Sequence, residues 1–164
     1  MDWYILLKFL HILAVIICVG GIFARQLLRQ HAKKTNEIQL FATFNQAAGR
    51  IEKVMVIPGT MAMLVLGVIL ALFGGAPILG FLQGASQNWL LVSNILITGI
   101  LVIIPTVLVP GGKRFEPLLQ VALAKGEITP ELRNAMNDKM VKFAHLYEEI
   151  GLIIVVALMV LKPF

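Results

Sequence analysis

Five ionisable residues lie in or beside long apolar stretches of the sequence and could do chemistry there: Lys8, His11, His145, Glu148 and Glu149. An ionisable group inside a membrane is costly, so it is a functional candidate by default. A neutral imidazole can ligate haem iron, and a buried carboxylate can relay a proton. These five side chains are therefore the first candidates for a functional site.

His11 belongs to a helix face of residues spaced by seven: Tyr4, His11, Cys18 and Arg25. The small residues of that stretch leave room either for a neighbouring helix or for a flat cofactor. By helix rise, His11 lies about 12 Å below the outer end of its span, and Asn94 and Thr98 lie about 8 and 14 Å deep in theirs. We therefore predict two alternatives for His11: it binds haem b iron in a pocket lined by Asn94 and Thr98, or it hydrogen-bonds across the bundle to one of them.

A second axial ligand for such a haem is not evident in the chain. His145 is about 24 Å from the outer end on the same count, and Met63 is about 17 Å deep. His31 falls in a loop, and Met63 is interpreted as a core residue. His11 would thus be a five-coordinate ligand, or another subunit would complete the site.

The other ionisable residues have two interpretations each. Lys8 is one turn from the outer end, where either its stem reaches the interface as an anchor or its ammonium group meets an acidic headgroup or a propionate. Glu148 and Glu149 lie about 18–20 Å deep in the fourth span. Either one of them faces the bundle, protonated or paired, as a proton relay or a support for a bound group, or the span is shifted and both lie at the inner interface.

The elements that must position these residues follow from composition. The chain has 164 residues, of which 59% are hydrophobic and 14% are charged. Soluble domains are about 45–50% apolar and about 25% charged, so a soluble globular protein is excluded. A single cysteine excludes a disulfide framework.

Four stretches approach the length of about 20 residues that a membrane-spanning helix needs: 3–24, 54–75, 89–110 and 143–161. Each must be helical, because a lone strand cannot satisfy its backbone in lipid. The first lacks the basic start and cleavage site of a signal peptide. We predict an all-α membrane protein, a four-helix transmembrane bundle forming one domain over residues 1–164.

Basic residues predict the orientation of the bundle. Of the 14 Lys and Arg residues, six lie between the first and second spans, six lie between the third and fourth, and none lies in 76–88. Basic loops stay cytoplasmic, so both termini are expected outside a bacterial inner membrane. The expected partners of these loops are anionic lipid headgroups, with possible contacts to other membrane subunits, and not nucleic acid.

The two basic connections are predicted to form helical cytoplasmic extensions. Ile38, Phe41 and Phe44 recur at helical spacing, and a second such series ends at Gly126. Thr129-Pro130 is typical of a helix start. The apolar face that follows it is predicted to continue without interruption into the fourth span as one long helix.

Several short motifs carry a family resemblance: Lys8-x-x-His11, Gly20-Gly21-Ile22-Phe23, Leu27-Leu28, His31-Ala32 and Leu158-Met159-Val160-Leu161-Lys162-Pro163. With them the chain resembles, over essentially its whole length, a family of small bacterial predicted integral membrane proteins. It is more distantly similar to the HemJ-type protoporphyrinogen oxidases and the copper-resistance D membrane proteins.

The more distant resemblance implies a role for one residue. In the HemJ type a first-span histidine, which corresponds here to His11, and a third-span lysine are thought to serve haem. Ser93 stands at about the position of that lysine. The resemblance therefore implies haem binding through His11 rather than porphyrinogen oxidation.

Three functions follow as expectations. The first is a haem b protein in membrane electron transfer or tetrapyrrole chemistry, with His11 as ligand. The second is a non-catalytic accessory subunit of a larger respiratory or photosynthetic complex, because intramembrane chemistry is scarce. The third and least favoured is a small-molecule or metal-ion transporter, based on Glu148, Glu149 and the predicted kinks at Pro58 and Pro105. The residues leave open whether the protein is an enzyme, because no zinc spacing, phosphate loop or nucleophile with its base is found.

Overall fold

The computed structural model describes residues 2–163, and every regular element in that range is helical. Four helical segments are long and apolar enough to cross a membrane: Trp3–Lys34, Ile38–Phe73, Trp89–Lys125 and Pro130–Leu161. The predicted all-helical class with four spans is thus confirmed. The segments exceed the predicted spans because the helices continue beyond the length that lipid requires.

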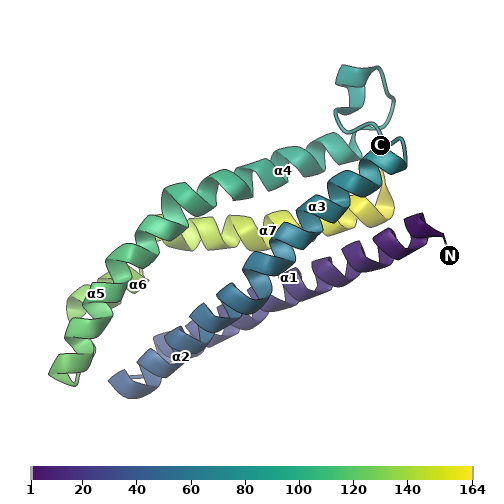
Figure 1. The fold of residues 1–164 in the computed structure, drawn as a ribbon. Helices are drawn as coiled ribbons and strands as arrows, with labels where there is room; N and C mark the ends of the chain where they lie inside the picture. Colours follow the sequence, from purple (N-terminus) through teal and green to yellow (C-terminus); the bar gives the residue numbers. More distant parts are fainter. Residues whose placement is uncertain (1, 164) are drawn as a thin grey trace.

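The elements follow the chain in the order of Figure 1. The first half contains α1 (Trp3–Lys34), α2 (Ile38–Ile51), the π-helical turn η1 (Glu52–Val56) and α3 (Ile57–Phe73). The second half contains the short 3₁₀ turn η2 (Gly80–Gln83), α4 (Trp89–Ile103), the π-helical turn η3 (Ile104–Leu108), α5 (Val109–Lys125), α6 (Pro130–Met136) and α7 (Lys139–Leu161). Through their π turns, α2–η1–α3 and α4–η3–α5 each form one continuous rod.

Both π turns lie beside prolines that the sequence marked as kinks. Pro58 is the second residue of α3, two residues after η1 ends, and Pro105 lies within η3. Proline lacks the N–H that would bond the carbonyl four residues earlier, so the helix widens there instead of ending. The widened turns carry Glu52 and Ile104 toward the middle of the bundle, where both line a cavity.

The helices pack as two groups. In the first group, α1 packs along α2 and α3, and in the second, α4 packs along α7 and α5 on α6. Figure 1 places both ends of the described chain and the loop around η2 at one end of the bundle, with α2, α5 and α6 at the other. We call the latter the basic end, because twelve of the 14 Lys and Arg residues lie in the stretches 25–53 and 113–142 that run toward it.

A seam of small residues joins α1 to α3. A methyl group added at Gly59 would lie 3.0 Å from the backbone nitrogen of Cys18, and one at Gly21 would lie 3.1 Å from Val56. Such close approach of two backbones is typical of small residues between membrane helices. Of the two predicted uses of the small residues in the first span, the structure shows helix packing at these positions.

The extensions at the basic end bury their apolar faces against one another. Ala32, Phe41, Ala122 and Leu132 are almost fully buried in one cluster there. Helical extensions were predicted, and the predicted helix stop at Gly126 and start at Thr129 are both confirmed: Gly126 has a φ of 76°, and the Thr129 hydroxyl accepts from the Leu132 N–H.

One prediction about this region is wrong. The sequence pattern predicts one helix from Leu132 into the fourth span, but α6 ends at Met136 and α7 begins at Lys139. Asp138 causes the break, because its carboxylate accepts hydrogen bonds from the N–H groups of Met140 and Val141 and caps a new helix. The cap turns the chain, so that α6 packs on α5.

Candidate functional site: an ion network beside a cavity between the helices

The most deeply buried cation of the described chain is Arg25 of α1, which is only 1% exposed. Its guanidinium donates to Oε2 of Glu52 in η1, at 2.6 Å, and to Glu148 of α7. A buried guanidinium needs such carboxylate partners, because removing an unpaired charge from water costs several kcal/mol. Arg25 thus joins three segments that lie far apart in the sequence.

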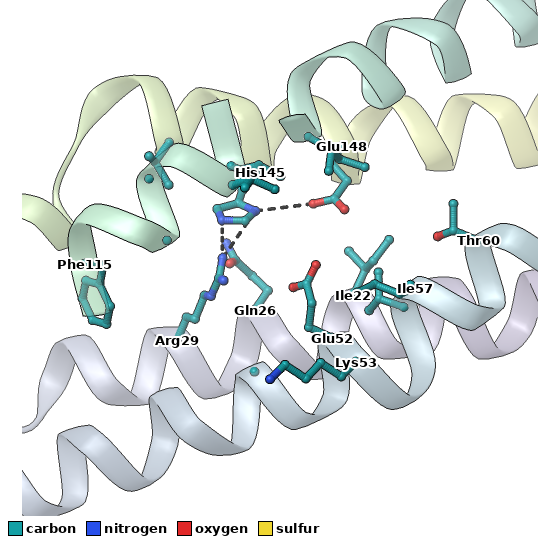
Figure 2. Close-up of a pocket in the computed structure, with 18 of the residues that line it drawn as sticks. Ile22, Gln26, Arg29, Glu52, Lys53, Ile57, Thr60, Phe115, His145 and Glu148 are labelled. Carbon is teal, nitrogen blue, oxygen red and sulfur yellow. Dashed lines mark hydrogen bonds and ion pairs between the residues drawn. The ribbon is translucent and has the colours of Figure 1, made fainter. Parts of the chain in front are cut away.

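One turn along α1, Arg29 reaches His145 of α7, as Figure 2 shows. Arginine can only donate, so the nearer ring nitrogen, Nε2, must be the acceptor. A neutral imidazole that accepts at Nε2 carries its proton on Nδ1. That N–H points to Oε2 of Glu148, 3.4 Å away, and the hydrogen-bond pattern thereby assigns the tautomer of His145.

The spacing of these residues along their helices builds the network. Arg25 and Arg29 are four residues apart on α1, and His145 and Glu148 are three apart on α7, so each pair lies on one face. With His145 neutral, two cations and two carboxylates balance. Both carboxylates contact Arg25, whereas Arg29 bonds only the neutral ring.

Beside this network lies a cavity of about 990 Å³ between the two groups of helices. Glu52, His145 and Glu148 line it together with Arg29. Such a volume is at the upper end of the range of about 300–1,000 Å³ that small-molecule sites occupy. The cavity therefore has the size of a ligand site, with the ion network in its wall.

The wall is apolar toward the middle of the spans and polar toward the basic end. Its apolar part consists mainly of side chains from α3 and α4: Ile57, Met61, Met63, Ile97, Ile100, Leu101 and Ile104. Of these, Met61 is 60% exposed and Leu101 is 42% exposed, so the cavity reaches the outer surface of the bundle between the two helices. Those two helices make few contacts with each other.

At the opposite end of the cavity the wall is basic. Its cations come from α1, α2, η1 and α7: Arg29, Lys33, Arg50, Lys53 and Lys142. Glu116 of α5 is the acidic residue of this part of the wall. We call these six residues the mouth of the cavity.

The residues predicted to form one haem pocket do not come together. The His11 ring packs against α3, where a methyl group on Gly67 would lie 3.1 Å from its Cε1 atom. Asn94 and Thr98 are on α4, which packs on α7 and not on α1. Asn94 donates to the carbonyl of Ile78 at 3.1 Å, and Thr98 is exposed on the outer surface.

The surroundings of His11 fit a bound haem in one respect and not in two others. In favour of haem, the Nδ1 atom of His11 is buried and has no hydrogen-bond partner among residues 2–163, although the ring packs against Gly67 of α3. However, His11 does not line the large cavity. Asn94 and Thr98 are not placed to line a group bound at His11, and the chain offers that group the imidazole alone.

The remaining predicted residues are placed as follows. Lys8 is exposed near the N-terminal end of α1, and Glu149 is half-buried with its Oε1 atom unpaired within the described range. Glu148 is the carboxylate that faces the bundle, and it is paired with Arg25. Of the two alternatives for the glutamates, the structure has one of them paired in the interior.

Sequence reasoning missed Arg29 and Glu52 and assigned Arg25 to a loop. A signal for Arg25 was present, because it continues the seven-residue spacing of His11 and Cys18. Cys18 does lie in the site, where its Sγ atom is 3.2 Å from the hydroxyl of Thr60 and both side chains line the cavity. Glu52 had no such signal, since it lies among basic residues in a connection.

The four long apolar helical segments define a polytopic helical membrane protein. Residues 5–163 match the family of predicted integral membrane proteins DUF2269, and the chain belongs to that family. No curated protein and no solved structure matches it.

Proposed function

We propose that the protein binds a small amphipathic molecule in the cavity between its two groups of helices. The observation that carries the proposal is the cavity itself: about 990 Å³, apolar where it reaches the surface between α3 and α4, and charged toward the basic end. An apolar pocket with a few convergent polar groups is the usual form of a small-molecule site. This corresponds to the binding step of the small-molecule transporter hypothesis.

Metal-ion transport is not favoured by the structure. Within residues 2–163, no group of three or more His, Cys, Asp or Glu side chains is placed to hold a metal ion. Divalent cations need several such oxygen or nitrogen ligands. The carboxylates of the network are instead occupied by Arg25.

The experiment fills the cavity with a larger side chain and measures which small molecules stay bound to the purified protein. Gly49 and Gly112 both line the cavity, and a Cβ added at either meets no atom within 4 Å. Gly49→Phe and Gly112→Phe should therefore fill the space without a clash. Native mass spectrometry of protein purified in a maltoside detergent should show bound molecules on the wild type and their loss in both variants.

Gly20→Phe is the matched control. A Cβ at Gly20 also meets nothing within 4 Å, but Gly20 is exposed and does not line the cavity. This variant should retain what the wild type retains. Equal retention by all four proteins would contradict the proposal, because the bound molecules would then lie on the outer surface.

Haem b binding through His11, in electron transfer or tetrapyrrole chemistry, is a second candidate. The unpaired Nδ1 atom of His11 favours it. Protein produced with ample haem should then show a Soret band that His11→Ala removes and His31→Ala keeps, since His31 is exposed on the surface. A wild type without that band would exclude this candidate. The accessory-subunit hypothesis has no observation specific to it, because lipid alone accounts for the apolar outer surface.

A further inference from the structure

The mouth of the cavity carries a positive charge that the protein itself does not neutralise. Its six residues comprise five cations and one carboxylate. Within residues 2–163, the ion pairs formed by lysine and arginine are those of Arg25 with Glu52 and Glu148 and of Arg114 with Asp138. None of the five cations of the mouth is therefore paired with a carboxylate.

Three of these cations lie on the two helices that meet beside the cavity, α1 and α7. Arg29 and Lys33 are one turn apart on α1, and Lys142 is one turn before His145 on α7. All three side chains line the same cavity, so Lys33 shares it with two further positive charges. Like charges repel, so the folded chain keeps them together at a cost that an anion would remove.

The other two cations extend the same charge across the opening. Arg50 ends α2 and Lys53 lies in η1, and both side chains line the cavity from the first group of helices. All three lysines and Arg50 are exposed, so an anion can reach them from water. Arg29 lies deeper, where its guanidinium touches neutral His145 and no carboxylate.

The apolar wall begins directly beside these cations. Ile57 follows η1, and Ile104 and Leu108 face the cavity from η3. A molecule whose charged head lies at the mouth would therefore extend its apolar part between α3 and α4, toward the opening at Met61 and Leu101. The cavity thus has positive charge at its mouth and apolar surface between α3 and α4. This is the same order as the charged head and the apolar part of an amphipathic anion.

We infer that the mouth binds the anionic head, a phosphate or a carboxylate, of an amphipathic molecule whose apolar part lies between α3 and α4. The inference rests on the proposed function and names the chemical class of its ligand. Lysine and arginine are the usual ligands of phosphate and carboxylate, and desolvation beside the apolar wall strengthens their attraction. Arg29 is the innermost contact of the head, and Lys33 and Lys142 hold it from either side.

The experiment compares three probes of equal chain length on the purified protein in maltoside micelles. These are dodecyl phosphate, dodecanol and dodecyltrimethylammonium, and inorganic phosphate is added as a fourth arm. A ligand that binds the folded state raises Tm with its concentration. Dodecyl phosphate should raise Tm at the lowest concentration, and dodecanol should need a higher concentration for the same rise. Dodecyltrimethylammonium should not change Tm.

Substitutions at the mouth distinguish this site from general attraction to a basic protein. Lys33→Gln removes one charged contact and should weaken the binding of dodecyl phosphate by about tenfold. Lys34→Gln removes the neighbouring charge, which is exposed and does not line the cavity, and should leave the affinity unchanged. Lys142→Gln, from the other helix, should repeat the effect of Lys33→Gln.

The outcomes separate the two proposals. Equal binding of dodecyl phosphate and dodecanol that Gly112→Phe abolishes would overturn the anionic head and leave the cavity proposal standing. Binding of no probe, or binding that Gly112→Phe does not change, would overturn both. Inorganic phosphate as effective as dodecyl phosphate would overturn the amphipathic part and assign the mouth to a free anion.

Discussion

Arg25 of α1 bonds Glu148 of α7, and this buried ion pair ties the two groups of helices together in the interior of the bundle. Contacts between α1 and α7 are otherwise sparse. The pair lies beside the cavity, so the same residues that hold the groups together also fix the width of the space between them. The stability of the bundle and the width of the cavity are therefore coupled at one point.

The first prediction concerns this pair. Arg25→Leu leaves Glu148 buried without a cation, and Glu52 loses the same partner. Removing one member of a buried pair typically costs about 3–5 kcal/mol, so the free energy of unfolding should fall by about that amount. Unfolding in mixed detergent micelles, followed by circular dichroism, measures the change.

The control for this prediction removes both charges. In Arg25→Leu combined with Glu148→Leu, no buried charge of the pair is left alone, and most of the lost stability should return. If Glu148→Leu destabilised the Arg25→Leu protein as much as it destabilises the wild type, the two side chains would not act as a pair.

The second prediction concerns the seam between α1 and α3. Gly59→Ala places a methyl group 3.0 Å from the backbone of Cys18, and the backbone there cannot move aside as a flexible side chain would. We expect overpacking to cost about 1–3 kcal/mol, seen as a lower Tm in detergent. Gly20→Ala, which meets no atom within 4 Å, should keep or slightly raise Tm. A Gly59→Ala protein as stable as the wild type would mean that the two helices can separate freely.

Sequence reasoning predicted the elements best where local chemistry decides them. Long apolar stretches gave four spans, and Thr129 and Gly126 marked a helix start and a helix end. Hydropathy does not locate the end of a helix that continues into water, so α1 extends to Lys34 rather than to residue 24. The break at Asp138 was missed because the apolar face continues on both sides of it.

The site could be predicted only in part, because it depends on which helices pair. His11, Asn94 and Thr98 have similar calculated depths, but equal depth brings residues together only on neighbouring helices, and α1 pairs with α3 whereas α4 pairs with α7. The partners of Arg25 are 27 and 123 residues away in the sequence. No local pattern in a single sequence encodes those two separations.

The third prediction concerns the cap of α7. The Asp138 carboxylate accepts from the N–H groups of Met140 and Val141, and Asp138→Ala removes both bonds. We expect a loss of about 0.5–2 kcal/mol, while Asp138→Asn should retain most of the stability because its side-chain oxygen can still accept. Hydrogen exchange should show faster exchange confined to the first turn of α7. Faster exchange over the whole helix would show instead that the cap positions α7 as a unit.

The fourth prediction concerns orientation. The positive-inside rule places the basic end in the cytoplasm and the 76–88 loop outside. Cys18→Ser gives a background without cysteine, since Cys18 is the single cysteine of the chain, and serine can keep the contact with Thr60. Into it we would introduce Ser86→Cys, in the loop after η2, or Asn134→Cys, in α6; both positions are exposed. Figure 1 shows these two elements at opposite ends of the bundle.

A maleimide that cannot cross membranes should label position 86 in intact cells and label position 134 only after the cells are permeabilised. Both positions are exposed, so a difference in labelling reports the side of the membrane rather than burial. The reverse pattern would place the mouth of the cavity outside the cell. An anionic ligand would then have to arrive from the external face, where the cations Lys33, Arg50, Lys53 and Lys142 would meet it.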